Sequence, residues 1–280
     1  MGERLAGYLA VLGLTGSAGA QLAAGQFHDV VLAGEVAYRF PRDEQSRRRL
    51  PAAVALLAAL GNAGLPAPVP LDTGHLHSPL GQCHVALTRL PGSPLGQVSG
   101  RDAGQAVVAQ LASLLDTLAG LGPDPEIGAL VPRADADHWT DFAGQVRHVL
   151  YPLMAPHGRA QADAELDALT TLAPAGPALV HADLGGANLL WTMPDGLPEL
   201  TGVLDWDGAC IGDQASDLAS IGVTIGWPLA ERIDARRCAS TRPMLADARI
   251  IAGTFALQQA LPAALSGDKV CLDDGLLRYR

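Results

Sequence analysis

Short apolar runs separated by turn-forming residues predict a β-rich region in the N-terminal third of the chain. Residues 25–40 are expected to form two strands joined by a turn at Ala33 and Gly34, because Val, Leu and aromatic side chains suit a half-buried sheet. Residues 1–23 contain a short apolar run and predict an amphipathic helix. A secretory signal is not favoured, because Glu3 lies beside the first arginine where a signal carries a basic cluster.

A helix and two more strands are predicted next along the chain. The helix covers residues 50–64, is rich in Ala and Leu, and has Pro51 at its first position. The strands follow on either side of a turn at 78–81, and the second strand ends near Leu90. The Pro/Gly-rich segment 90–96 then interrupts the pattern and marks a lobe boundary.

Helical periodicity dominates the rest of the chain. Residues 102–121 place apolar side chains on one face at helical spacing, namely Val107, Leu111, Leu114, Leu115 and Leu118. Further helices are expected at 139–154, 160–173, 213–226 and 244–265. Between them, residues 178–208 predict a compact β region. The chain is therefore expected to be an α+β protein, with a small β-rich lobe at 1–90 and a larger, mainly helical lobe at 91–280.

Composition narrows the class of protein. The 280 residues are 49% hydrophobic and 17% charged, which excludes global disorder and allows one large domain or two small ones that share a cleft. A net charge of −10 disfavours a nucleic-acid partner, since phosphates need a positive field, and suits a cationic small molecule. The only lysine is Lys269, so arginine supplies every other positive side chain among the 19.

The cysteines and the apolar stretches predict a cytoplasmic protein with no membrane partner. The four cysteines are widely spaced and form no CxxC pair, so reduced thiols that pack in the core fit better than a disulfide frame or a structural zinc site. They are Cys83, Cys210, Cys238 and Cys271. Gly, Pro and polar residues interrupt every candidate for a membrane span.

A hairpin in the β region is expected to bring polar side chains together. Two apolar runs flank the turn residues 193–196, so the chain should fold back as an antiparallel pair. Such a turn places Asn188 opposite a residue near Asp205, so that these two side chains meet. The preceding loop, 181–187, contains two glycines that let its backbone curl, and Asp183 can then face the same cleft.

This set of side chains suits Mg²⁺-dependent phosphoryl transfer. Carboxylate and carboxamide oxygens are hard ligands, and Mg²⁺ usually keeps several waters and shares the phosphates of its substrate. In that chemistry one aspartate accepts the proton of an attacking hydroxyl, while another aspartate and an asparagine hold the metal. The arrangement H-x-D-x-x-x-x-N followed by a strand and D-x-D is the specific signal. The chain has only two asparagines, Asn62 and Asn188, so abundance does not explain this placement.

These motifs resemble the aminoglycoside phosphotransferase and choline-kinase-like enzymes, which share a two-lobed protein-kinase-like fold. The similarity spans most of the chain. It lies in HADLGGANLLW (181–191), GVLDWDGACIGDQASDLA (202–219), AYRFPR (37–42), PAPVP (66–70) and TRLPGSPL (88–95). The resemblance implies transfer of the γ-phosphate of ATP or GTP, with Mg²⁺, to a hydroxyl of a small molecule. Aminoglycoside-like, macrolide-like and metabolic alcohols all remain open as the acceptor.

The resemblance also assigns roles to individual residues of the C-terminal part. It implies Asp183 as the catalytic base and Asn188 and Asp205 as the ligands of Mg²⁺. His181 would organise the catalytic loop, and Asp217 would tie the next helix to that loop rather than react. The role of Asp207, which is adjacent to the site, is left open: its side chain contacts the metal or the substrate, or it contacts neither.

In the N-terminal lobe the resemblance implies nucleotide binding. Arg39 occupies the strand position where such kinases carry a phosphate-binding lysine, and Thr88, Arg89 and Leu90 would form the hinge that meets the purine. An arginine keeps the charge of the lysine but is a planar fork rather than a point charge.

Two departures from the family pattern concern the phosphate end of this lobe. Ala53 falls where the helix glutamate that pairs with the strand cation is expected, residues 45–71 contain no acid, and Glu44 is the nearest substitute. The lobe also lacks a G-x-G-x-x-G loop, and its first turn must be built from residues 25–28, which include Gln26. A nucleotide-binding pseudokinase without transfer activity is therefore the alternative function.

Other polar clusters carry simpler interpretations. His75, His77, Cys83 and His84 are four potential metal ligands within ten residues, but a regular hairpin would point them to different faces, so zinc is not favoured. Arg47, Arg48 and Arg49 predict an exposed basic face with no ligand. The acids of the helical lobe suit either a solvated surface or a cationic acceptor; they are Asp135, Asp137, Asp141, Asp163, Glu165 and Asp167.

Overall fold

The computed structural model describes residues 2–17, 19–25, 27–95, 101–134, 137–173, 176–237 and 243–280. Gln26, Asp135 and Cys238 lie outside these ranges. The chain divides into two compact units, each discontinuous in sequence. The first consists of Met1–Gln110, Pro125–Val131 and Gly186–Gly208, and the second of Leu111–Asp124, Pro132–Gly185 and Ala209–Arg280. Because these units follow packing rather than function, the lobes at 1–90 and 91–280 stay a prediction.

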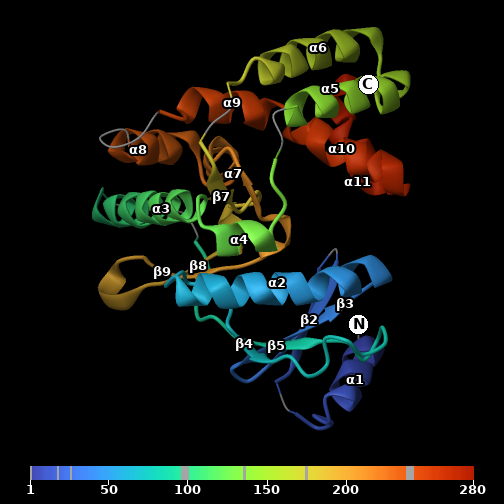
Figure 1. Ribbon diagram of the computed structural model, residues 1–280, viewed down its shortest axis with the longest axis vertical. Coiled ribbons are helices and arrows are strands. Elements are labelled where there is room, and N and C mark those ends of the chain that lie inside the picture. Colours follow the sequence, from blue (N-terminus) through green and yellow to red (C-terminus); the bar gives the residue numbers. More distant parts are fainter. Residues whose placement is uncertain are drawn as a thin grey trace. The chain divides into compact units, whose positions relative to one another are not determined.

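A five-stranded antiparallel sheet forms the centre of the first unit (Figure 1). The strand order is β1-β2-β3-β5-β4, and the predicted turn between β2 and β3 lies one residue later than expected, at Gly34 and Glu35. The strands are β1 (Gln21–Ala24), β2 (His28–Ala33), β3 (Val36–Pro41), β4 (Pro70–Asp72) and β5 (Val85–Thr88). The four strands predicted in this part of the chain are confirmed, and β1 is an additional edge strand.

Two helices cover this sheet. The helix predicted within residues 1–23 is confirmed only in its first part, as α1 (Gly2–Val11), because residues 21–23 belong to β1. The Tyr8 ring of α1 stacks on Phe40 of β3 with 4.3 Å between ring centroids. α2 (Glu44–Asn62) packs on β3 and β4 and buries an apolar face (Figure 1). That face is made of Leu50, Val54, Leu56, Leu57 and Leu60.

The start of α2 differs from the prediction. The helix begins at Glu44 rather than near residue 50, so Pro51 lies inside the helix and the prediction that it opens the helix was wrong. Asp43 caps the helix instead: its carboxylate accepts a hydrogen bond of 2.7 Å from the backbone N–H of Ser46. An aspartate cap followed by a glutamate in the first turn stabilises a helix start through hydrogen bonding and the helix dipole.

The predicted hairpin of the β region is confirmed within the first unit. β8 (Leu189–Thr192) and β9 (Glu199–Val203) pair antiparallel, with Leu189 opposite Val203, and β6 (Ser93–Pro94) adds a short third strand on the other side of β8. The turn is a single 3₁₀ turn at Pro194–Gly196. A backbone hydrogen bond of 2.7 Å from Val203 N–H to the Pro66 carbonyl ties the hairpin to the segment before β4.

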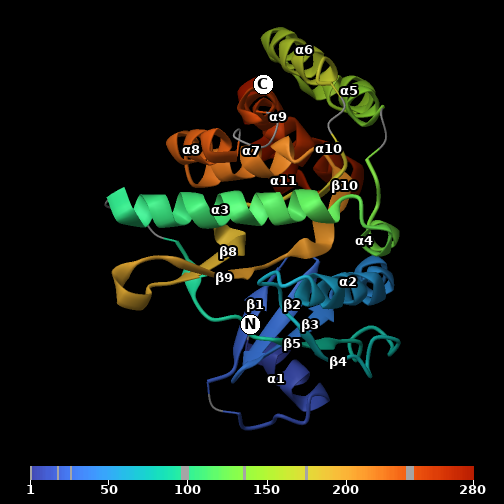
Figure 2. The same ribbon diagram turned by 60° about the vertical axis from the view of Figure 1, so that its left-hand side comes forward.

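The second unit is mainly helical. In it β7 (Ala178–Val180) and β10 (Cys210–Gly212) form a two-stranded antiparallel sheet. The helices are α5 (His138–Val149), α6 (Pro156–Thr170), α7 (Ala215–Thr224), α8 (Trp227–Arg237), α9 (Leu245–Gly253), α10 (Phe255–Ser266) and α11 (Lys269–Gly275). Figure 2 shows α7, α8 and α9 packed side by side. The helix predicted over 244–265 is two helices that meet at Thr254, and α8 has no counterpart among the predictions.

α3 (Arg101–Leu121) and the short helix α4 (Pro125–Leu130) complete the fold. α3 confirms the helix predicted over 102–121. Among the described residues it is also the one helix long and apolar enough to cross a membrane, contrary to the expectation that polar residues interrupt every such stretch. Val107, Leu111, Leu115 and Leu118 on one face of α3 are completely buried, as in a core helix of a folded protein.

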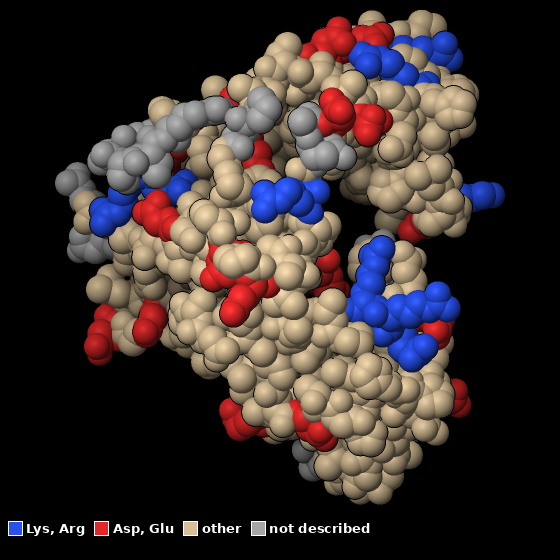
Figure 3. All heavy atoms as spheres, in the orientation of Figure 1, with Lys and Arg blue, Asp and Glu red and all other residues tan. Residues whose placement is uncertain are grey.

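Basic side chains gather on the first unit over the start of α2 (Figure 3). Arg47 and Arg48 both contact Glu44 of the same helix, with closest distances of 2.7 and 3.3 Å. Arg48 and Arg49 are exposed to solvent. These contacts agree with the interpretation of this run as a solvated face.

Candidate functional site

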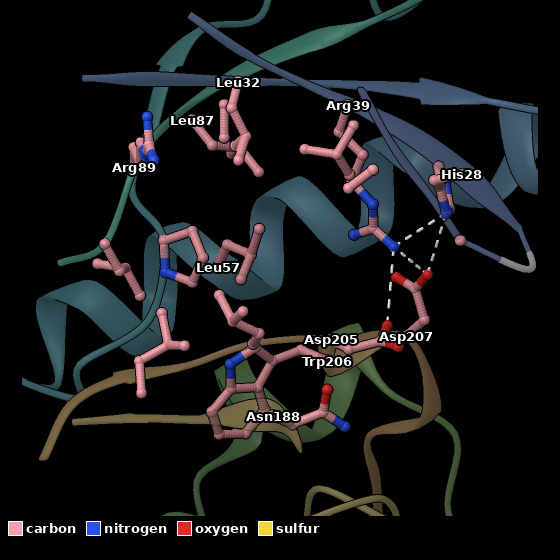
Figure 4. A pocket seen from close by; sticks show the side chains of 18 of the residues that line it. His28, Leu32, Arg39, Leu57, Leu87, Arg89, Asn188, Asp205, Trp206 and Asp207 are labelled. Atoms are coloured by element: carbon pink, nitrogen blue, oxygen red, sulfur yellow. Dashed lines mark hydrogen bonds and ion pairs between the residues drawn. The ribbon is translucent and has the colours of Figure 1, made fainter. Parts of the chain in front are cut away.

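A pocket of about 560 Å³ lies within the first unit (Figure 4). One end of it is apolar and is lined by side chains of the sheet, of α2 and of β8, among them Val30, Leu32, Leu57, Leu87 and Leu190. The three hinge residues predicted from the resemblance, Thr88, Arg89 and Leu90, also line it. The other end is polar and holds His28, Arg39, Asn188, Asp205 and Asp207. The pocket therefore gathers every predicted nucleotide and metal residue of the first unit.

The backbone of the hinge segment is partly committed to the sheet. Thr88 N–H donates to the Val69 carbonyl at 2.9 Å, and the Thr88 hydroxyl oxygen accepts from Val69 N–H at 2.9 Å. Arg89 N–H donates to the Glu35 carbonyl at 2.9 Å. These bonds hold the segment at the edge of the pocket, so its backbone position is fixed by the turn between β2 and β3 and by the chain before β4.

Arg39 is the cation of the polar end. It lies on β3, its side chain is 13% exposed, and its Nη2 atom contacts an oxygen of Asp207. The same Nη2 lies 2.9 Å from Nδ1 of His28 and 3.9 Å from Oδ1 of Asp205 (Figure 4). Burial by itself raises the pKa of Asp207, but the hydrogen bond from His28 and the charge of Arg39 outweigh it and hold that pKa below its usual value. Asp207 is therefore a carboxylate at neutral pH.

Asn188 and Asp205 line the pocket from the two sides of the hairpin. Asn188 ends a 3₁₀ turn (Gly186–Asn188), and its carbonyl accepts a hydrogen bond of 2.8 Å from Leu204 N–H, which confirms that the hairpin brings residue 188 opposite residue 204. Asp205 follows β9 with a φ of 61°, in the left-handed region that aspartate tolerates better than most residues. That turn of the backbone directs the 55% exposed carboxylate into the pocket.

The oxygen atoms of this hairpin fit the Mg²⁺ that the resemblance implies. A carboxylate and a carboxamide are hard oxygen donors, and Mg²⁺ needs few protein ligands because waters and phosphates complete its shell. Within the described ranges no three His, Cys, Asp or Glu side chains group to hold a metal by themselves. Among the four potential metal ligands at 75–84, for which zinc was not favoured, His75 stacks on His84 with ring centroids 4.4 Å apart, and the buried Cys83 thiol donates to the Leu76 carbonyl.

The loop that carries Asp183 belongs to the second unit. It leaves β7 at His181, which is completely buried, and the Nδ1 atom of His181 accepts a hydrogen bond of 3.2 Å from Asp183 N–H. Ala182 has a φ of 68°, so the backbone reverses sharply just before Asp183, whose side chain is exposed. His181 thus shapes the loop from the inside, which matches the organising role that the resemblance implies.

Asp217 of α7 anchors the same loop. Its carboxylate accepts hydrogen bonds from the backbone N–H groups of His181 at 3.0 Å and Ala182 at 2.9 Å. Complete burial raises its pKa to about 7, although the two backbone hydrogen bonds act in the opposite direction. Gly185 ends the loop against α7, where a Cβ would lie 3.2 Å from Thr224. The prediction that Asp217 ties the next helix to the loop is confirmed.

The sequence did not reveal the partners of Arg39. Glu44, the nearest acid to the missing helix glutamate, contacts Arg47 and Arg48 instead. The contacts of Arg39 come from His28, expected only as part of the first turn, and from Asp207, for which the sequence leaves contact with metal or substrate open. The D-x-D spacing was a usable signal, because both aspartates follow the same strand and enter the same pocket.

The chain has a protein-kinase-like fold, which is defined by an antiparallel sheet with this pocket beneath it, followed by a mainly helical region. Solved structures of other phosphotransferases have the same fold. The GDP complex of a mutant aminoglycoside 2'-phosphotransferase-IIIa superposes with a TM-score of 0.85 at 20% identity, over 97% of this chain and 93% of the other. A macrolide 2'-phosphotransferase from Brachybacterium faecium gives 0.73 at 22% identity, over 97% and 98%. The predicted fold class is confirmed.

Sequence comparison defines the family. A model described as the phosphotransferase enzyme family matches residues 20–255. The viomycin phosphotransferase of Streptomyces vinaceus is 40% identical over 260 residues, which make up 91% of each chain. The chain belongs to the phosphotransferase enzyme family and is an enzyme of the aminoglycoside phosphotransferase type.

Proposed function

We propose that this enzyme transfers the γ-phosphate of a nucleoside triphosphate to a hydroxyl of an antibiotic of the viomycin type. The observation that carries the proposal is the 40% identity to a viomycin phosphotransferase along nearly the full length of both chains. An identity of that level over the acceptor-binding as well as the nucleotide-binding regions supports a related acceptor. Much lower identity to the aminoglycoside and macrolide enzymes supports only the common fold.

The pocket of the first unit is proposed as the nucleotide site. A volume of about 560 Å³ lies within the range of small-molecule sites. Its apolar end, between Leu32, Leu57 and Leu190, suits a flat purine, while the backbone of Thr88–Leu90 would meet the purine edge. Its polar end suits the phosphates, with Arg39 as the contacting cation. ATP and GTP both fit this description, and the choice between them is part of the test below.

The transfer step is assigned to residues of the matched motif. Asp183 accepts the proton of the acceptor hydroxyl while the oxygen of that hydroxyl bonds to the γ-phosphorus. At the same time the bond between the γ-phosphorus and the oxygen that bridges it to the β-phosphate breaks, which releases nucleoside diphosphate. Asn188 and Asp205 would hold Mg²⁺, which neutralises charge on the phosphates when bound. The buried bonds of His181 and Asp217 support this assignment, because they fix the loop on which Asp183 lies.

The electrostatics of the chain favour a basic acceptor. A net charge of −10 attracts cations, and the second unit carries exposed acids such as Asp141 at its surface. We infer a cytoplasmic location, because nucleoside triphosphates are cytoplasmic substrates and Cys83, Cys210 and Cys271 are free thiols in the structure.

An acceptor screen tests the proposal directly. Purified enzyme is supplied with Mg²⁺ and γ-labelled ATP or GTP, together with viomycin, kanamycin or a macrolide in separate reactions, and labelled product is counted against a no-acceptor blank. Transfer to viomycin well above transfer to the other two supports the proposal. Nucleotide binding in a thermal shift assay without transfer to any acceptor would instead establish the pseudokinase alternative.

A further inference from the structure

Arg39 is held from two directions in the pocket of the first unit. Its Nη2 atom contacts Asp207 from the end of the β8–β9 hairpin and His28, at 2.9 Å, from the neighbouring strand β2. The side chains of Arg39, Asp207 and His28 are 13%, 21% and 8% exposed, so the cluster is largely withdrawn from solvent. A cation fixed by two side chains in a partly buried site loses little freedom when it meets a ligand.

The helix beside this strand provides no such partner. The resembling kinases carry a glutamate there, whereas residues 45–71 of this chain contain no acid. Glu44, at the start of α2, binds Arg47 through two hydrogen bonds of 2.7 and 2.8 Å. From the contacts of Arg39 we propose that Asp207, together with His28, positions the Arg39 guanidinium and so takes the place of the missing helix carboxylate. This proposal rests on the proposed phosphotransfer function.

His28 contacts both members of the ion pair. Its Nδ1 atom lies 2.9 Å from Nη2 of Arg39 and 3.3 Å from Oδ2 of Asp207. Its other ring nitrogen, Nε2, is buried and has no hydrogen-bond partner among the described residues. A buried polar atom without a partner carries a cost in folding free energy, so the position of the ring between Arg39 and Asp207 is retained against local stability. Asp207 and His28 are thus positioning residues that act through Arg39.

Steady-state kinetics of Asp207→Asn provide the first test, with Glu44→Gln as the control. The positioning role predicts that kcat falls by about tenfold or more in Asp207→Asn while the KM for nucleotide changes by less than about threefold. Glu44→Gln keeps wild-type kinetics. In a double-mutant cycle, Asp207→Asn has little further effect once Arg39→Ala is present. Additive losses in the cycle, or an unchanged kcat in Asp207→Asn, would overturn the proposal.

A Mg²⁺ titration separates positioning from metal binding. If Asp207 acts through Arg39, the Mg²⁺ concentration for half-maximal rate is the same in Asp207→Asn and the wild type. A marked rise in that concentration would assign Asp207 to the metal and overturn the proposal.

The ion pair can also be observed without any turnover. In ¹⁵N-arginine-labelled protein, a held guanidinium gives separate Nη signals because rotation about its Nε–Cζ bond is slow, and Arg39→Lys identifies the Arg39 signals. We expect these signals to be separate in the wild type and to merge in Asp207→Asn. Signals that stay separate in the variant would overturn the proposal. An enzyme that transfers no phosphate but gives the expected spectra would overturn the proposed function and leave the positioning of Arg39 supported.

Discussion

The carboxylate of Asp217 accepts a hydrogen bond of 3.0 Å from the backbone N–H of His181, a residue 36 positions earlier in the chain. A second bond, to Ala182 N–H, is 2.9 Å long. Both join α7 to the loop that carries Asp183 within the second unit. An aspartate far from the motif in sequence therefore fixes the backbone on which the proposed base depends.

Replacing Asp217 by alanine should destabilise the protein and slow transfer. Asp217→Ala leaves two backbone N–H groups without their acceptor, at a cost of about 1–3 kcal/mol each. We expect a free energy of unfolding lower by about 2–4 kcal/mol in urea and a reduced kcat in the remaining folded enzyme. Wild-type stability in this variant would show that the two bonds are not maintained in solution.

The same residue predicts a pH dependence of stability. Burial raises the pKa of folded Asp217 to about 7 from a reference value of 3.8, so the folded state retains a proton that the unfolded chain has released between these values. Its contribution to stability is therefore complete below about pH 4 and is lost as pH rises towards about 7. Urea unfolding should show wild type losing stability relative to Asp217→Asn across this window. A difference that stays constant with pH would contradict the shift.

The metal assignment predicts that Asp205→Asn weakens binding of the Mg²⁺-nucleotide. Asparagine also tolerates the φ of 61°, so the change removes a charge without adding backbone strain. Affinity should fall by about tenfold or more, since even groups that only support a metal ligand have effects of that size. Asp195→Asn is the matched control, because Asp195 has a φ of 52° in the exposed turn of the same hairpin and does not line the pocket. Equal affinities in both variants would refute the assignment.

Close packing behind the hinge makes Gly202 sensitive to a single methyl group. A Cβ at residue 202 would lie 2.9 Å from Cδ1 and 3.1 Å from Cβ of Leu90. Gly202→Ala should therefore cost about 1–3 kcal/mol of stability and raise the KM for nucleotide by displacing Leu90. Gly144→Ala, in α5 with nothing within 4 Å of the new Cβ, should instead add about 0.5–1 kcal/mol. Thermal unfolding distinguishes the two, and a stabilised Gly202→Ala would show that the hinge packing is looser than described.

The sequence predicted the parts of the site that local patterns determine. The β8–β9 hairpin follows from two apolar runs and a Pro-Asp-Gly turn, and it brought Asn188 and Asp205 into one pocket as expected. The predicted start of α2 at Pro51 is wrong because Asp43 carries the stronger capping signal. The break between α9 and α10 at Thr254 directly follows Gly253, a residue that weakens a helix, and this signal was missed when 244–265 was predicted as one helix.

The contacts of Arg39 could not be derived from the sequence in the same way. Asp207 lies 168 positions away from Arg39 in the chain, and no periodicity relates the two. His28 lies two residues from Val30, which is opposite Arg39 in the β2–β3 register, so the hairpin places His28 and Arg39 diagonally on one face of the sheet. The contact with Asp207, by contrast, depends on tertiary structure.

The most direct test of the account is phosphate transfer to viomycin by Asp183→Asn compared with the wild type. The variant removes the proton acceptor and keeps Asn188, Asp205 and the nucleotide pocket, so nucleotide affinity measured by calorimetry provides the control. We predict a kcat reduced by about a hundredfold or more with nearly unchanged nucleotide affinity. Near wild-type turnover by Asp183→Asn would contradict the proposed mechanism.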